Sequence, residues 1–192
     1  ISGATSSTYT LTQSDVGTAI TVTASYTDAL GASESSTSAA TSAVANVNDA
    51  STVAISGTAT EDQVLTATVT DEDGATGTIT YTWARAGSAI SGATSSTYTL
   101  TQSDVGSAMT VTVTFTDDLS TSESATSAAT AAVTNVNDDP TGSVTITGTA
   151  QEDETLGIAT SLMGDEDGLG TFSYQWNRAG TAISGANGLV YT

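Results

Sequence analysis

Cysteine, histidine and lysine are absent from the 192 residues, and proline occurs once. Without cysteine, the chain can form neither a disulfide nor a zinc–thiolate site, and it has no thiol nucleophile. Without histidine, it lacks the side chain most often used for acid–base chemistry near neutral pH. No apolar run approaches the roughly 20 residues that a membrane-spanning helix needs. We therefore expect neither membrane insertion nor an enzyme.

Positive charge is also nearly absent. Aspartate and glutamate together number 21 against two arginines, which gives a formal net charge of −19. Binding to nucleic acid or to an anionic membrane relies on lysine and arginine, so we expect neither as a partner. Divalent cations suit such a surface. The acids could also serve only to keep a long secreted protein soluble.

What the chain does have is internal repetition. The segment ISGATSSTYTLTQSDVG occurs identically at 1–17 and 90–106, and a diverged start of it, ISGANGLVYT, stands at 183–192. The three copies start 89 and 93 residues apart, which is the size of one small domain. Arrays of such domains usually provide length rather than chemistry. We expect the C-terminal part of one repeat, a complete repeat and the N-terminal part of a third at 1–46, 47–137 and 138–192.

Apolar residues alternate with serine and threonine at a period of two, which is typical of half-buried strands. The run Ile20–Tyr26 has its copy at Met109–Phe115, and the run Ile79–Trp83 has its copy at Phe172–Trp176. Alanine-rich stretches also carry many serines and threonines, so we interpret them as final strands. The fold class predicted is all-β, with two-sheet sandwiches. For the complete repeat the pattern predicts strands at 52–58, 64–70, 77–85, 96–101, 108–116 and 122–134.

A tryptophan, Trp83, lies on the third predicted strand, and Arg85 follows two positions later; both recur as Trp176 and Arg178. Downstream, Asp104 belongs to an L-x-x-x-D-x-G motif that precedes a long alternating strand. In these features the chain resembles tandem immunoglobulin-like domains. The resemblance implies that the tryptophan fills the core and that Arg85 and Asp104 form a partly buried, charge-assisted bond. The cysteine pair and the corner tyrosine of antibody domains are missing, so no relationship to antibodies follows.

The same motifs show what the two end segments lack. Arg178 has no D-x-G motif after it, and Asp15 has no tryptophan–arginine strand before it. Two arrangements are open: the protein continues at both ends, or the end of one chain completes the start of the next. In the second arrangement, Arg178 would lie against Asp15 of a neighbouring chain.

Acidic residues fall on turns that the predicted topology brings to the two ends of each repeat. Together with the NVND linkers, these turns resemble the calcium junctions of cadherin-type repeats, which combine a far-turn glutamate, an Asp/Asn linker and a near-turn D-x-D. The resemblance implies bound Ca²⁺, which takes six to eight oxygen ligands. The candidate ligands of the first junction are Asn46, Asn48, Asp49, Asp71, Asp73, Asp117 and Asp118. Those of the second junction are Glu61, Asp62, Asn135, Asn137, Asp138, Asp139, Asp165 and Asp167.

The acidic clusters allow two other interpretations. The D-E-D-G sequence matches the start of an EF-hand loop, but the remainder of that motif, including the glutamate at its twelfth position, is missing. Alternatively, aspartate, asparagine and glycine are simply the residues that turns favour. The second interpretation stays open beside calcium.

The near-identical repeats resemble the extender segments of large bacterial surface or secreted adhesins. The resemblance implies an extracellular or cell-surface location and neighbouring repeats of the same protein as partners. An alternative is a subunit of an extracellular filament, sheath or surface layer, with other copies as partners. A polysaccharide-binding module is less favoured, because the pattern assigns the tryptophans to the core. The pair Asp71 and Asp73 could act as acid and base, but its recurrence at Asp165 and Asp167 favours an architectural role.

Overall fold

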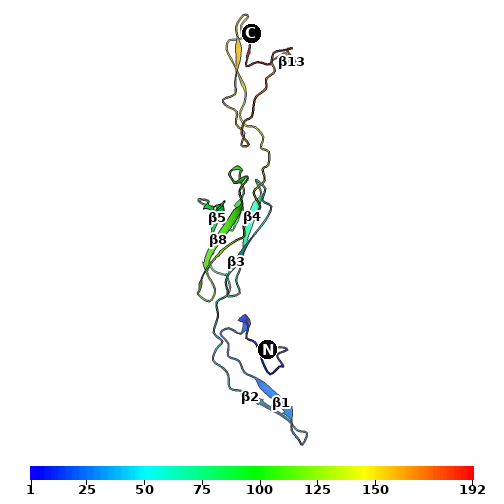
Figure 1. The fold of residues 1–192 in the computed structure, drawn as a ribbon, viewed down its shortest axis with the longest axis vertical. Coiled ribbons are helices and arrows are strands. Elements are labelled where there is room, and N and C mark those ends of the chain that lie inside the picture. Colours follow the sequence, from blue (N-terminus) through cyan, green and yellow to red (C-terminus); the bar gives the residue numbers. More distant parts are fainter.

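The computed structural model describes residues 1–192 and is all-β, without an α-helix. Three parts follow one another along an elongated molecule, with the chain ends in the two outer parts (Figure 1). We call residues 47–137 the central unit, residues 1–46 the N-terminal segment and residues 138–192 the C-terminal segment. Five small sheets are present, none of them closed.

The central unit contains two antiparallel sheets. One has the strand order β3-β4-β7 and the other β6-β5-β8-β9. The longest strand pairing is that of β5 with β8, in which Trp83 lies opposite Val111 and Arg85 lies opposite Met109. The strands are β3 (Thr52–Ser56), β4 (Val64–Thr70), β5 (Thr80–Arg85), β6 (Ser88–Ala89), β7 (Thr97–Thr99), β8 (Met109–Thr116) and β9 (Ser122–Thr126).

The hydrophobic core lies between these two sheets. Val53, Leu65 and Ala67 come from the first sheet, and Trp83 and Val111 come from the second. The alternation is clear on β8, whose side chains are buried at every second position from Met109 to Phe115. Apolar and threonine positions therefore divide between the core and solvent as the period of two predicts. The architecture is consistent with a β-sandwich.

The expected core tryptophan and its neighbouring ion pair are confirmed. Trp83 is fully buried, and its indole N–H donates to the carbonyl oxygen of Ser95 at 2.9 Å. Nε of Arg85 donates to Oδ1 of Asp104 at 2.7 Å. Asp104 ends the short 3₁₀ turn η2 (Gln102–Asp104) and is itself fully buried.

The two end segments form smaller sheets. In the N-terminal segment, the 3₁₀ turn η1 (Gln13–Asp15) precedes a single hairpin of β1 (Thr23–Thr27) and β2 (Ser33–Thr37). In the C-terminal segment, the sheets are β10-β11-β14 and β12-β13. The strands concerned are β10 (Thr145–Thr147), β11 (Leu156–Ala159), β12 (Asn177–Arg178), β13 (Thr181–Ala182) and β14 (Val190–Tyr191).

The prediction of one continuous strand over 122–134 is wrong, because β9 ends at Thr126 and only isolated bridges follow. The reason lies in two hydroxyl side chains. Oγ of Ser127 accepts the N–H of Val111, and Oγ1 of Thr130 accepts the N–H of Met109, each at 3.0 Å. Side-chain oxygens thus replace backbone carbonyls, and the regular ladder stops. The alanine-rich stretch 38–45 lacks a strand for the same reason, since Ser38 and Thr41 accept backbone N–H groups there.

Two further alternating runs differ from the prediction. Residues 172–176 form none, and β1 begins at Thr23 although its run starts at Ile20. In the central unit the equivalent segments, β5 and the start of β8, pair with each other. Each end segment contains only one member of this pair, so neither has a ladder to join.

Candidate functional site: the two junctions

The candidate site occurs twice, where the NVND linkers 46–49 and 135–138 join successive parts of the chain. At each junction three elements meet: the linker, the D-x-D turn that follows it, and the 3₁₀ turn that precedes it. The near turn meets the linker at both junctions, since Asp73 accepts the N–H of Asp49 and Asp167 accepts that of Asp138. The far turn expected at the second junction also meets the linker, where Glu61 accepts the N–H of Val136.

At the second junction, Asp167 is the centre of the hydrogen bonds. Its carboxylate accepts the backbone N–H of Asp138 at 2.9 Å, Nδ2 of Asn135 at 2.7 Å and Nε2 of Gln102 at 3.4 Å. The first two bonds lower the pKa of Asp167, because they stabilise its charged form. The backbone N–H of Asp167 in turn donates to Oδ1 of Asp165 at 2.9 Å. The D-x-D turn is thereby fixed to the linker and to the central unit.

The first junction repeats this arrangement. Asp73 accepts the backbone N–H of Asp49 at 2.9 Å and Nε2 of Gln13 at 2.7 Å, and its own N–H donates to Oδ1 of Asp71 at 2.8 Å. The geometry therefore belongs to the repeat and not to one position. Asn46 differs from Asn135, its copy at the second junction, because the side chain of Asn46 makes no bond to the D-x-D turn, whereas that of Asn135 bonds Asp167.

Glu61 brings a far-turn acid to the second junction, as expected. It is 2% exposed, and its Oε2 accepts the backbone N–H of Val136 at 3.1 Å. One carboxylate oxygen each of Glu61, Asp138 and Glu166 lies within 4.8 Å of the others. Three carboxylates at this separation repel one another unless a cation or protons neutralise them. The arrangement can therefore bind a divalent cation.

Five buried side-chain atoms in the structure have no hydrogen-bond partner, and all five are oxygens at the junctions. Buried polar atoms normally have partners, so each such atom calls for a physical reason. Carboxylate and amide oxygens are the ligands that a hard cation requires. The five atoms are Asn46 Oδ1, Asp71 Oδ2 and Asp117 Oδ2 at the first junction, and Gln102 Oε1 and Asp138 Oδ2 at the second.

Two carboxyls at the junctions have raised pKa values. Burial is the main cause of the raised pKa of Asp71, and the charges of Glu123, Asp73 and Asp117 add to it. Burial likewise raises the pKa of Asp138, and Asp167 is the largest of the neighbouring charges that raise it further. At Asp71 the N–H of Asp73 offsets only part of this effect. A bound cation would favour the charged forms of both carboxyls.

Other predicted ligands make turn contacts. Oδ1 of Asp117 accepts the N–H groups of Leu119 and Thr121, which closes its own turn, and only Oδ2 stays without a partner. Oδ1 of Asp118 accepts both the N–H and the hydroxyl of Thr76.

Besides Asn135, two linker asparagines donate their Nδ2 groups. Asn48 bonds Glu123 at 2.8 Å, and Asn137 bonds the carbonyl oxygen of Asp138 at 3.1 Å. The oxygens of these amides remain the atoms that a cation could use. Asp62 and Asp139 are close enough to Asp138 for their charges to raise its pKa.

Sequence reasoning missed four junction residues: Gln13, Gln102, Glu123 and Glu166. A signal for the glutamines existed, because the QSD triplet is identical in both copies of the 17-residue segment, at 1–17 and 90–106. Glu166 lies between two predicted ligands and was excluded by the D-x-D pattern. Glu123 gave no signal, since it alternates like any outward strand residue, yet it accepts bonds from Asn48 and Ser51.

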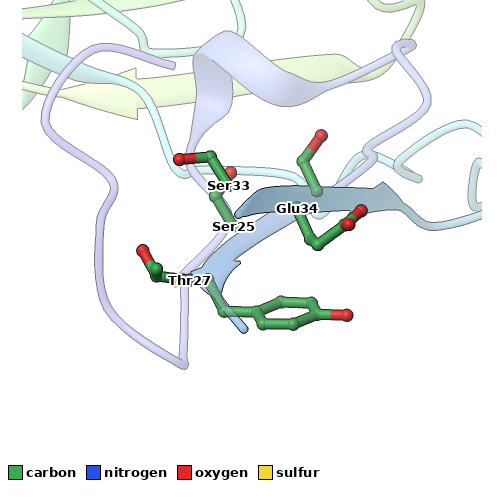
Figure 2. Close-up of a pocket in the computed structure, with 6 residues that line it drawn as sticks. Ser25, Thr27, Ser33 and Glu34 are labelled. Atoms are coloured by element: carbon green, nitrogen blue, oxygen red, sulfur yellow. The ribbon is translucent and has the colours of Figure 1, made fainter. Parts of the chain in front are cut away.

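Elsewhere, a polar hollow of about 390 Å³ lies on the β1–β2 hairpin (Figure 2). Its lining consists mainly of hydroxyl groups together with Glu34 and Tyr26. No second carboxylate faces Glu34 across it, so the hollow offers no acid–base pair. The junctions remain the candidate site.

Comparison with family models, with curated proteins and with solved structures finds no match for the chain. No helix in the structure has the length and apolar character needed to cross a membrane.

Proposed function

We propose that the chain is a structural extender from a large extracellular bacterial adhesin, built from tandem immunoglobulin-like repeats and stiffened by calcium at its junctions. The observation that carries the proposal is the repetition of one junction geometry at two places, with every unpartnered buried side-chain oxygen located there. Repetition of a site in each unit favours architecture over catalysis.

The arrangement along one axis supports a spacer function (Figure 1). Only the linkers and a few side-chain bonds, such as Gln13 to Asp73, connect successive parts. Small polar contacts of this kind allow the parts to move relative to one another. A spacer that must hold another domain at a distance therefore needs an additional restraint.

Calcium supplies that restraint in the proposed mechanism. Without a cation, the carboxylates of Glu61, Asp138 and Glu166 repel each other across the junction and favour separation of its elements. A cation that binds oxygens from the far turn, the linker and the near turn removes the repulsion and connects all three. The linker then becomes rigid.

The experiment measures the radius of gyration by small-angle X-ray scattering and the melting temperature, each with calcium, with magnesium and with chelator. We expect calcium to raise both, because a stiff rod is more extended than a jointed one and binding stabilises the folded state. Magnesium should have a smaller effect, since it requires a stricter octahedral geometry.

The matched variants are Asp138→Asn, at the second junction, and Asp28→Asn, in the β1–β2 turn. Both remove one negative charge, but only Asp138 has an unpartnered buried oxygen at a junction. We expect Asp138→Asn to weaken calcium binding roughly tenfold and Asp28→Asn to leave it unchanged. Identical scattering curves with calcium and with chelator would contradict the proposal.

A further inference from the structure

We propose that Gln102 is a ligand of the cation at the second junction and transmits the binding of that cation to the central unit. Its side-chain oxygen would join the carboxylates of Glu61, Asp138 and Glu166, which already lie close together. The inference deepens the proposed function and rests on it, because it names a further residue of the same calcium site. Gln102 belongs to neither the linker nor the D-x-D turn.

The orientation of the Gln102 amide is fixed by its neighbour. Its Nε2 donates to Oδ1 of Asp167 at 3.4 Å. An ionised carboxylate only accepts hydrogen bonds, so the NH₂ group faces Asp167 and the oxygen points elsewhere. Gln13, the copy of Gln102 at the first junction, bonds Asp73 in the same way at 2.7 Å. The orientation therefore belongs to the junction geometry.

The oxygen of this amide has no hydrogen-bond partner. Oε1 of Gln102 is buried and accepts no bond, and the same is true of Oδ2 of Asp138 at the same junction. A buried acceptor without a donor is unfavourable. A calcium ion takes carboxylate and amide oxygens as ligands, so one ion can satisfy both atoms.

Backbone and side-chain bonds place Gln102 next to all three elements of the junction. The carbonyl oxygen of Leu100 accepts the N–H of Asp62 at 3.1 Å, so the chain that leads to Gln102 runs beside the far turn. Asp167, on the near turn, accepts the N–H of Asp138 at 2.9 Å with its other carboxylate oxygen. The linker is thereby held by the same carboxylate as Gln102.

A neutral oxygen suits this position better than another carboxylate. Glu61, Asp138 and Glu166 together carry more negative charge than one divalent cation neutralises. A further carboxylate would add to their repulsion whenever the cation is absent. The amide of Gln102 supplies an oxygen ligand without that additional charge.

Gln102 also connects the junction to the interior of the central unit. It begins the three-residue turn η2, whose last residue, Asp104, accepts the N–H of Thr101 at 2.8 Å and holds Arg85. A cation that holds Gln102 therefore restrains Asp104 as well. Calcium should slow the hydrogen exchange of the Asp104 N–H, which donates to the carbonyl oxygen of Thr101.

The experiment follows calcium binding by nuclear magnetic resonance, with one backbone N–H as the probe of each junction. The N–H of Val136, bonded to Glu61, reports on the second junction. The N–H of Asp49, bonded to Asp73, reports on the first. Each titration gives a dissociation constant for its own junction within the intact chain.

Two variants distinguish a ligand from a residue that only holds Asp167. Gln102→Leu and Gln102→Glu both lose the N–H that bonds Asp167, but glutamate keeps an oxygen at this position. We expect Gln102→Leu to raise the dissociation constant at the second junction roughly tenfold. Gln102→Glu should bind calcium at least as tightly as the unchanged protein. Without calcium it should melt at a lower temperature, since its charge faces Asp167.

Gln63→Leu and Gln63→Glu are the matched controls. The side chain of Gln63 is exposed and lies two residues after Glu61, so the same substitutions alter the charge near the junction without removing the proposed ligand. We expect much smaller changes from these controls, because solvent and salt screen an exposed charge. The dissociation constant reported by Asp49 should stay the same in all four variants.

Hydrogen exchange of the Asp104 N–H tests the connection to the central unit. At saturating calcium the exchange should slow in the unchanged protein but not in Gln102→Leu. Equal slowing in both proteins would show that Gln102 does not transmit binding, which contradicts this inference.

Equal weakening of calcium binding by Gln102→Leu and Gln102→Glu would overturn the inference, because Gln102 would then only hold Asp167. Unchanged dissociation constants in both variants would overturn it too. Either result would leave the proposed function intact, since the unchanged protein would still bind calcium. If neither Val136 nor Asp49 responded to calcium in the unchanged protein, the proposed function and this inference would both be wrong.

Discussion

At the scale of single residues, Asp104 and Asp15 form a natural comparison within one molecule. The two carboxylates make the same bonds to a tyrosine and a threonine, but only Asp104 has an arginine. Burial alone would raise the pKa of Asp104; the backbone N–H of Thr101 and the guanidinium of Arg85 outweigh this effect and lower it. Asp104 is therefore charged when folded and stabilises the central unit.

We predict that Asp104→Asn lowers the free energy of unfolding of the central unit by about 3 kcal/mol, because the change leaves Arg85 without its buried partner. Asp15→Asn should change the same quantity little. The measurement is urea unfolding followed by the fluorescence of Trp83 in a Trp176→Phe background, which confines the signal to the central unit.

The same pair gives a pH dependence. Because the folded pKa of Asp104 lies below its ordinary value of 3.8, its contribution is present above that value and is lost as the pH falls through the folded pKa. The free energy of unfolding of the Trp176→Phe protein, measured in urea, should therefore fall more steeply below about pH 4 than that of the same protein carrying Asp104→Asn. Parallel pH curves would show that Asp104 does not contribute.

At the scale of elements, the near turn of the central unit depends on Gly74. Its φ of +96° lies in the left-handed region, and a Cβ there would meet Oδ2 of Asp118 at less than van der Waals distance. Gly168 has nearly the same φ, +92°, but nothing lies within 4 Å of its Cβ position. A comparison with Gly168 therefore separates the cost of a positive φ from the cost of the close contact with Asp118.

We predict that Gly74→Ala lowers the free energy of unfolding by about 1–2 kcal/mol more than Gly168→Ala does. The melting temperature should fall further in the same order. The additional loss arises because Asp118 must move and release Thr76. Differential scanning calorimetry measures it. Equal losses would indicate that the turn tolerates the displacement of Asp118.

Strands that follow from local alternation could be predicted from the sequence. Strand ends that depend on a side-chain hydroxyl replacing a backbone hydrogen-bond acceptor could not. β8 and its buried face follow from the spacing of Met109 to Phe115 alone. The Arg85–Asp104 bond was predicted only through the resemblance to immunoglobulin-like domains, and the structure contains it. The end of β9 did not follow, because Ser127 and Thr130 replace backbone acceptors by hydroxyls, and nothing in a period of two reveals that.

The candidate site was predictable to a similar degree. The turns carrying Asp73 and Glu61 were assigned to the correct ends because strand order determines where turns lie. The contacts of Gln102 and Glu123 depend on how successive parts face each other, which a pattern within one repeat does not contain.

At the scale of the whole molecule, the linkers should be the calcium-sensitive points of cleavage. Trypsin is a poor probe, since the chain has two arginines and no lysine. A protease that cleaves beside aspartate can act at Asp49 and Asp138 in the linkers. We predict faster cleavage there with chelator than with calcium, because the linker is then mobile.

Asp28, in the β1–β2 turn, serves as the internal control for that digestion. It lies outside both junctions, and its carboxylate is held by Leu30 and Ala32 of its own turn. Its rate of cleavage should not depend on calcium. If cleavage at 46–50 proceeds equally with and without chelator, the linker is not a calcium-controlled joint.

The hydroxyl groups that end the regular ladders have a consequence for a molecule of near-identical repeats. The same hydroxyl that accepts an N–H also donates to a neighbouring carbonyl: Thr130 to Ala131, Ser38 to Ala39 and Thr41 to Ser42. Backbone acceptors along this border are thus already occupied by the chain itself. A strand from an identical repeat finds no row of free acceptors there, which protects folding units from mispairing with their copies.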